Sequence, residues 1–150
     1  MTTIQTQETF PAAHFVQTAD SDSSCRNLHG HTWKVIVNIE GKVQNDGMLI
    51  DFRHIKEIIK QLDHKTLIPE ILDIEEDVYI SKNWIITTDY NLYSIPKEDI
   101  VILPIDAVTA ENLAKYFMKK IKEHLEIGCL VTVTVYESEN SFAEEVEICE

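Results

Sequence analysis

The sequence predicts an α+β fold built as a single domain over residues 1–150. Strand-like segments stand at both ends of the chain, and two amphipathic helical patterns lie between them. No Gly-, Ser- or Pro-rich linker and no internal repeat divides the chain, which favours one domain. The expected order of elements is strand, strand, helix, a middle segment, helix, strand, strand.

The first half of the chain predicts two strands and a helix. Residues 6–15 and 32–39 have strand composition, and β-branched residues dominate the second of these segments. Between residues 51 and 62 the apolar side chains recur at the three-to-four spacing of an amphipathic helix, and Asp51 stands at its N-cap position.

The second half predicts a longer helix and a pair of strands. Thr109 stands at an N-cap position, apolar residues then recur every fourth position to Leu125, and Gly128 is the expected stop. Residues 130–136 alternate Val with Thr, and residues 142–148 are the expected antiparallel partner. Because such alternation suits antiparallel pairing, we expect an antiparallel four-stranded sheet with two helices on one face.

An inserted segment of residues 69–101 separates the two helices. Its side chains form no pattern that indicates a chemical role. Residues 78–93 are aromatic and β-branched enough to predict a hairpin within it.

Composition indicates a soluble globular domain and excludes several classes of partner. Thirteen Lys and Arg against 26 Asp and Glu give a net charge of −13, so we expect no nucleic acid and no anionic membrane surface as partner. The most apolar stretch, residues 127–136, is too short to span a bilayer, and residues 1–10 lack a signal-peptide layout. Three widely spaced cysteines form no disulfide framework, which favours a cytoplasmic location.

Three histidines form the most informative cluster. On a strand, residues i and i+2 point to the same face, so His29 and His31 would project together. His14, on a neighbouring strand, would bring a third nitrogen, and three neutral ligands with an open fourth position are typical of catalytic zinc. Spacing alone leaves a Zn²⁺ site and ordinary surface histidines equally open.

Four further positions are candidates for chemistry. Cys25 has polar neighbours, which predicts an exposed loop thiol that could act as a base or nucleophile near the metal. Asp63 and His64 could pair as an orienting acid and a proton carrier if the chain turns sharply, although Asp and His at a helix end are more often simply solvated. Glu111 has a sufficient structural role in the first turn of a helix. Glu137 lies at the end of a strand, where its carboxylate could accept two hydrogen bonds from the amidine-like edge of a ligand.

Five motifs follow one another along the chain: Phe10-Pro-Ala-Ala-His14, Cys25-x3-His29-Gly-His31, Leu62-Asp-His64-Lys, Thr109-Ala-Glu111-Asn-Leu-Ala and Val135-Tyr-Glu137. Together they resemble the 6-pyruvoyl-tetrahydropterin synthase / 6-carboxy-tetrahydropterin synthase (QueD) family. The resemblance covers nearly the whole chain except residues 69–101. It implies a tunnelling-fold (T-fold) subunit, zinc held by His14, His29 and His31, and a homohexamer built as a dimer of trimers with active sites between subunits.

The resemblance also implies roles for the remaining candidates. Cys25 corresponds to the catalytic thiol, and Asp63 and His64 correspond to an orienting acid and a proton-transfer imidazole. Glu137 matches the residue that anchors the 2-amino and N3 edge of the pterin, and Glu111 lies in a helix-start motif near the pterin pocket.

Two reactions of 7,8-dihydroneopterin triphosphate occur within the family that the chain resembles. One branch eliminates triphosphate to give 6-pyruvoyl-tetrahydropterin. The other also releases acetaldehyde and gives 6-carboxy-5,6,7,8-tetrahydropterin on the queuosine pathway. The spacer of three residues between Cys25 and His29 resembles the carboxy branch, whereas the long segment 69–101 departs from compact carboxy-synthases. A third alternative is a non-catalytic T-fold protein that binds a pterin or purine.

Overall fold

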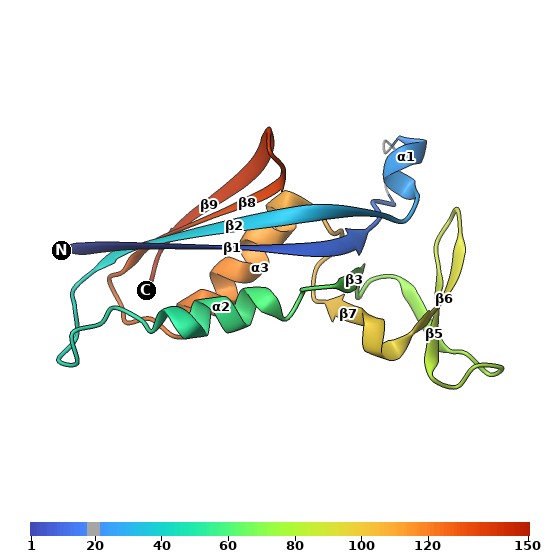
Figure 1. Cartoon of the computed structure of the whole chain (residues 1–150), viewed down its shortest axis with the longest axis horizontal. Helices are drawn as coiled ribbons and strands as arrows, with labels where there is room; N and C mark the ends of the chain where they lie inside the picture. Colours follow the sequence, from blue (N-terminus) through green and yellow to red (C-terminus); the bar gives the residue numbers. More distant parts are fainter. Residues whose placement is uncertain (18–21) are drawn as a thin grey trace.

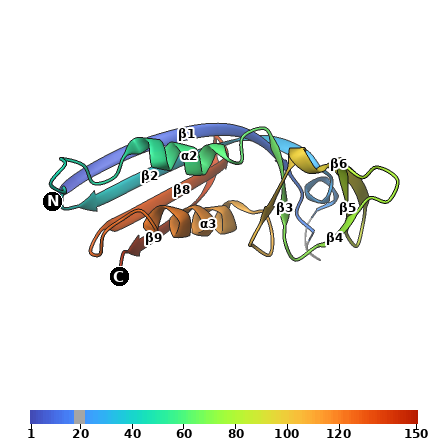
Figure 2. The same ribbon diagram turned by 90° about the horizontal axis from the view of Figure 1, so that it is seen from below.

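A computed structural model describes residues 1–17 and 22–150 and contains a curved six-stranded sheet with two helices against one face (Figures 1 and 2). The elements in chain order are β1 (Thr2–His14), α1 (Ser23–Arg26), β2 (His29–Gly41), α2 (Phe52–Lys60), β3 (Lys65–Pro69), β4 (Asp73–Glu76), β5 (Asn83–Thr87), β6 (Leu92–Pro96), η1 (Lys97–Asp99), β7 (Ile100–Leu103), α3 (Ala110–Lys122), β8 (Leu130–Ser138) and β9 (Ser141–Ile148). The α+β class is therefore confirmed.

The main sheet has the strand order β7-β3-β1-β2-β8-β9. Four of its strands pair antiparallel in the order β1-β2-β8-β9. These are the four strands that the sequence predicts. The expectation of a four-stranded sheet was incomplete, because β3 joins β1 in parallel and β7 joins β3 in parallel. These two strands are short and show no alternation of apolar and polar residues, so period-two patterning does not detect them.

The helices bury their apolar stripes against the sheet. Ile55 and Ile59 of α2 and Phe117 of α3 have no exposed surface and share one core cluster with the inward row of β2. Side chains of Asp51 and Thr109 cap α2 and α3 as predicted. Gly128 was wrongly expected to end α3: the helix stops at Lys122, and Gly128 supplies a φ of +93° for the turn into β8.

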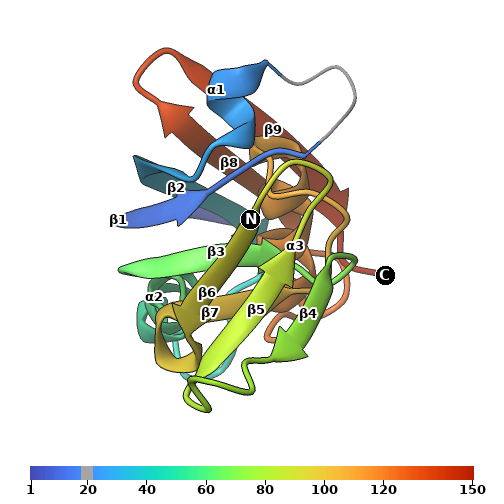
Figure 3. The same ribbon diagram turned by 90° about the vertical axis from the view of Figure 1, so that its right-hand side faces the viewer.

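The inserted segment forms a second, three-stranded sheet of β4, β5 and β6 beyond one end of the main sheet (Figure 3). The predicted hairpin is present as β5–β6, and β4 adds a third antiparallel strand. Phe15, Ile68 and Ile86 form a small core that joins this inserted sheet (residues 73–96) to the main sheet. None of the helices in residues 1–17 and 22–150 is long and apolar enough to cross a membrane.

Candidate active site

The three predicted histidines lie together at one end of the main sheet. His29 and His31 alternate on β2, and His14 is the register partner of His29 on β1. Because strand side chains alternate, all three point to the same face as the hydrophobic core. Their ligand atoms lie within 4.8 Å of one another, a spacing that allows them to share one metal ion.

Backbone carbonyls orient two of these imidazoles. His14 donates from Nδ1 to the carbonyl of Val108 at 2.7 Å, and His29 donates from Nδ1 to the carbonyl of Asn27 at 2.6 Å. Each bond leaves the Nε2 lone pair free, the arrangement found around metal-bound histidine. Among the described residues, the buried Nε2 atoms of His14 and His31 have no hydrogen-bond partner. These imidazole nitrogens form a donor set that fits a metal ion.

The environment keeps the imidazoles neutral. Burial is the main cause that lowers the pKa of His14 to about 4, and the nearby His29 and His31 lower it further. Burial also lowers the pKa of His31, although Glu137 opposes that shift. Since only neutral imidazole coordinates a metal, these shifts favour the ligating form at neutral pH.

The two predicted substrate-binding carboxylates lie at the same end of the fold. Glu137, near the end of β8, places Oε1 3.5 Å from Nε2 of His31. Glu111 is an exposed residue in the first turn of α3, three positions after Val108, whose carbonyl holds His14. Glu137 therefore borders the histidine cluster directly, and Glu111 belongs to the helix start beside it.

Cys25 lies on α1, a single helical turn where the sequence predicted a loop. The side chain of Asp22 caps this turn by accepting a bond from the backbone N–H of Ser24, an effect that composition did not reveal. The carbonyl of Cys25 accepts a 2.8 Å bond from the N–H of Val16, two residues beyond His14. As predicted, the thiol is exposed rather than buried.

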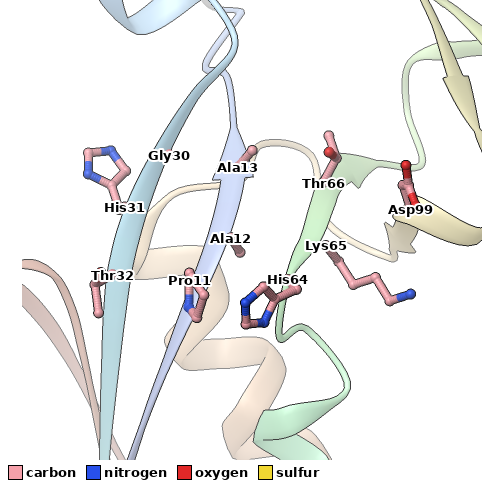
Figure 4. A pocket seen from close by; sticks show the side chains of 10 residues that line it. All are labelled: Pro11, Ala12, Ala13, Gly30, His31, Thr32, His64, Lys65, Thr66 and Asp99. Carbon is pink, nitrogen blue, oxygen red and sulfur yellow. The ribbon is translucent and has the colours of Figure 1, made fainter.

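Asp63 and His64 are joined by a 3.1 Å contact between carboxylate and Nδ1 after α2. The chain turns sharply there, as required: His64 has a φ of +59°, and its N–H bonds the carbonyl of Pro11. His64 lines an open pocket of about 530 Å³ together with His31, Lys65 and Asp99. Figure 4 shows β1 running between the His31 and His64 side chains, so one subunit does not bring these imidazoles into contact.

Sequence reasoning missed two groups of the site. Trp33 has no exposed surface, and its ring centroid lies 5.0 Å from that of His14 and 5.5 Å from that of His31. It continues the i+2 series of His29 and His31, so the strand period could have identified it. The carbonyl of Val108 carries no sequence signal, because any residue supplies a carbonyl.

Comparison with known proteins places the chain in a family. The family model described as 6-pyruvoyl tetrahydropterin synthase matches residues 3–147. Proteins of Pyrococcus horikoshii and Pyrococcus abyssi, both named putative 6-carboxy-5,6,7,8-tetrahydropterin synthase, are 34% identical over 138 residues and 36% identical over 136 residues, each covering 90% of this chain and 83% of the relative. A catalytic-residue mutant of Plasmodium vivax 6-pyruvoyltetrahydropterin synthase aligns with a TM-score of 0.78 and 28% identity over 98% of both chains. This chain belongs to the 6-pyruvoyl tetrahydropterin synthase family.

Proposed function

We propose that the protein is a zinc-dependent lyase that converts 7,8-dihydroneopterin triphosphate to 6-carboxy-5,6,7,8-tetrahydropterin, with release of acetaldehyde and triphosphate. The observation that carries this proposal is the cluster of His14, His29 and His31, in which two buried nitrogens lack a hydrogen-bond partner among the described residues. Family membership supplies the pterin chemistry, and the names of the Pyrococcus relatives favour the carboxy product.

The three histidines would hold zinc through Nε2 and leave a coordination position free for substrate. Zinc bound there would polarise the side-chain hydroxyls of the substrate and make the adjoining C–H more acidic. The carbonyls of Val108 and Asn27 fix the imidazole tautomers, so His14 and His29 need no rearrangement when substrate arrives.

Proton transfer is assigned to Cys25 and to the Asp63–His64 pair. The exposed side chain of Cys25, as a thiolate, would accept a proton from a bound substrate and become a thiol, and His64 would deliver or remove one at the opposite side of the reacting carbon. Asp63 orients the imidazole through its 3.1 Å contact with Nδ1. Glu137 would anchor the 2-amino and N3 edge of the pterin by two charge-assisted bonds, with Glu111 beside it.

Assembly completes this site in the proposal. Because β1 separates His31 from His64 within one subunit, we expect His64 and Asp63 to serve the zinc site of a neighbouring subunit in a homohexamer. Mixing Cys25→Ala and His64→Ala subunits, each inactive alone, tests this arrangement. Random assembly would restore complete sites at about a quarter of wild-type number. If every site were contained in one subunit, mixed oligomers verified by mass would stay inactive.

A pyruvoyl product is the second candidate, favoured by the structural similarity to the Plasmodium vivax synthase. One assay separates the candidates: incubate the zinc-loaded protein with 7,8-dihydroneopterin triphosphate and measure triphosphate and acetaldehyde. Equal amounts of both products are the expected result. Triphosphate without acetaldehyde would establish the pyruvoyl branch, and binding without either product would make the protein a pterin binder.

A further inference from the structure

The inserted sheet contacts the helix that carries the proposed catalytic thiol. Tyr90, in the turn between β5 and β6, lies with its ring centroid 4.3 Å from the guanidinium carbon of Arg26. Arg26 follows Cys25 directly and is the last residue of α1. A cation–π contact therefore joins the insertion to the thiol-bearing turn, although the two partners are far apart in the sequence.

The turn that presents Tyr90 is built by one side chain. Oγ1 of Thr88 accepts bonds from the N–H groups of Tyr90 at 3.2 Å and Asn91 at 2.8 Å. The N–H of Thr88 bonds the carbonyl of Asn91 at 2.9 Å and closes the turn. Local hydrogen bonds thus fix the backbone at Tyr90, while its side chain remains about half exposed.

The turn end of the same hairpin is anchored beside the histidine cluster, because Tyr93 pairs with Ile86 close to the turn. Tyr93 on β6 stacks on Phe15 with ring centroids 5.2 Å apart and an interplanar angle of 9°. Phe15 follows His14 and is buried in the small core with Ile68 and Ile86. The turn end of the hairpin is therefore held against Phe15, the residue that follows β1, and the turn itself reaches α1 through Tyr90.

Helix α1 is short and exposed. It spans four residues and contains no buried side chain, and so short a helix is unstable alone. Two bonds tie it to the end of β1, from the N–H of Val16 to the carbonyl of Cys25 and from Nε2 of Gln17 to the carbonyl of Arg26, each 2.8 Å long. The Tyr90 ring adds a contact from a third direction.

We infer that Tyr90 is a positioning residue, which acts through Arg26 to hold α1 and thereby the Cys25 thiol. This inference rests on the proposed role of Cys25 in proton transfer. It gives the inserted sheet a function in the same site: the segment braces the thiol-bearing turn against the strand that carries His14. Among residues 1–17 and 22–150, loss of the ring leaves the bonds from Val16 and Gln17 to hold α1 beside the end of β1.

The test compares three variants: Tyr90→Ala removes the ring, Tyr90→Phe keeps its face, and Tyr79→Ala removes a 93% exposed tyrosine of the same insertion as a matched control. An exposed cation–π contact corresponds to a factor of about two to five in an equilibrium. In Tyr90→Ala we expect amide hydrogen exchange in a peptide covering residues 22–28 to rise by that factor. We expect kcat to fall by at least as much, with KM nearly unchanged.

Tyr90→Phe and Tyr79→Ala should match the wild type in both measurements, because each leaves the ring over Arg26. An Arg26→Ala background should abolish the effect of Tyr90→Ala on exchange, as expected for two partners of one contact. Unchanged exchange and kcat in Tyr90→Ala would overturn the inference, as would an equal effect of Tyr79→Ala. A wild-type protein without turnover would refute the proposed function instead, and the exchange comparison would still decide the contact.

Discussion

Protonation of His14 should destabilise the metal-free protein as the pH falls. The pKa of His14 is lowered from 6.5 to about 4 because the folded chain buries its imidazole, of which 1% is exposed. The folded state therefore binds fewer protons than the unfolded state between these values, and stability present above pH 6.5 is lost as the pH falls toward 4. One pKa unit corresponds to about 1.4 kcal/mol, so the loss reaches about 2 kcal/mol near pH 5 and about 3 kcal/mol near pH 4.

The assay is urea unfolding of the chelator-treated protein at fixed concentration, compared with His14→Asn at each pH. The Asn side-chain amide can donate to the Val108 carbonyl as Nδ1 does but does not titrate, so other groups cancel in the difference. The stability advantage of the wild type should shrink by about 2 kcal/mol between about pH 8 and pH 5. A constant difference, or an NMR titration that places the pKa of His14 at 6 or above, would refute the reasoning.

Three further substitutions test the assigned roles. His31→Ala should lose bound zinc and activity while the fold survives. The control Thr32→Ala should keep the metal, because the Thr32 side chain points to the other face of β2. Full metal content in His31→Ala, measured by elemental analysis, would remove His31 from the ligand set. Cys25→Ala should retain zinc and pterin binding but lower turnover by a factor of about 100 or more, which is the size of a general acid–base contribution. Loss of zinc in this variant would instead make the Cys25 thiol a metal ligand. Glu137→Gln should raise KM about tenfold or more through loss of a charge-assisted contact, as steady-state kinetics would report, and an unchanged KM would place Glu137 outside the pterin site.

Local patterns predicted the parts of the fold that obey a single period. The Val and Thr alternation of β8 and the four-residue spacing of α3 each identify one element, because packing against one core selects the same side chains that the period marks. The two parallel strands were not predicted, because β3 and β7 are short, do not alternate, and pair with each other across the inserted segment. Pairing over such a distance depends on tertiary contacts that no local pattern contains.

The histidine cluster was predictable because strand geometry places His29 and His31 on one face. The predicted strand over residues 6–15 also placed His14 beside them, and the pairing of His14 with His29 puts all three on one face. What the sequence left open was whether these histidines are a metal site or ordinary surface residues. The turn of α1 was missed because a single side chain, that of Asp22, decides it. The contact of Tyr90 with Arg26 was missed for a different reason: it joins an insertion to a remote helix, and no period connects the two.

The position of the histidines explains how one sheet provides both a core and an open candidate metal site. The inward row of β2 passes from Val37 and Val35 through Trp33, all essentially without exposed surface, to His31 and His29, which are half-buried. The buried part of this row lies in the core shared with α2 and α3, and the row continues beyond it to the histidines. The proposed metal ligands therefore share the rigidity of a paired strand while two of them stay partly exposed. Cys25 has the opposite setting, an exposed thiol on a four-residue helix. In the proposed function a strand fixes the metal ligands and a turn held by Arg26 and Tyr90 presents the proton-transfer thiol, so the fold separates the two roles between a strand and a turn.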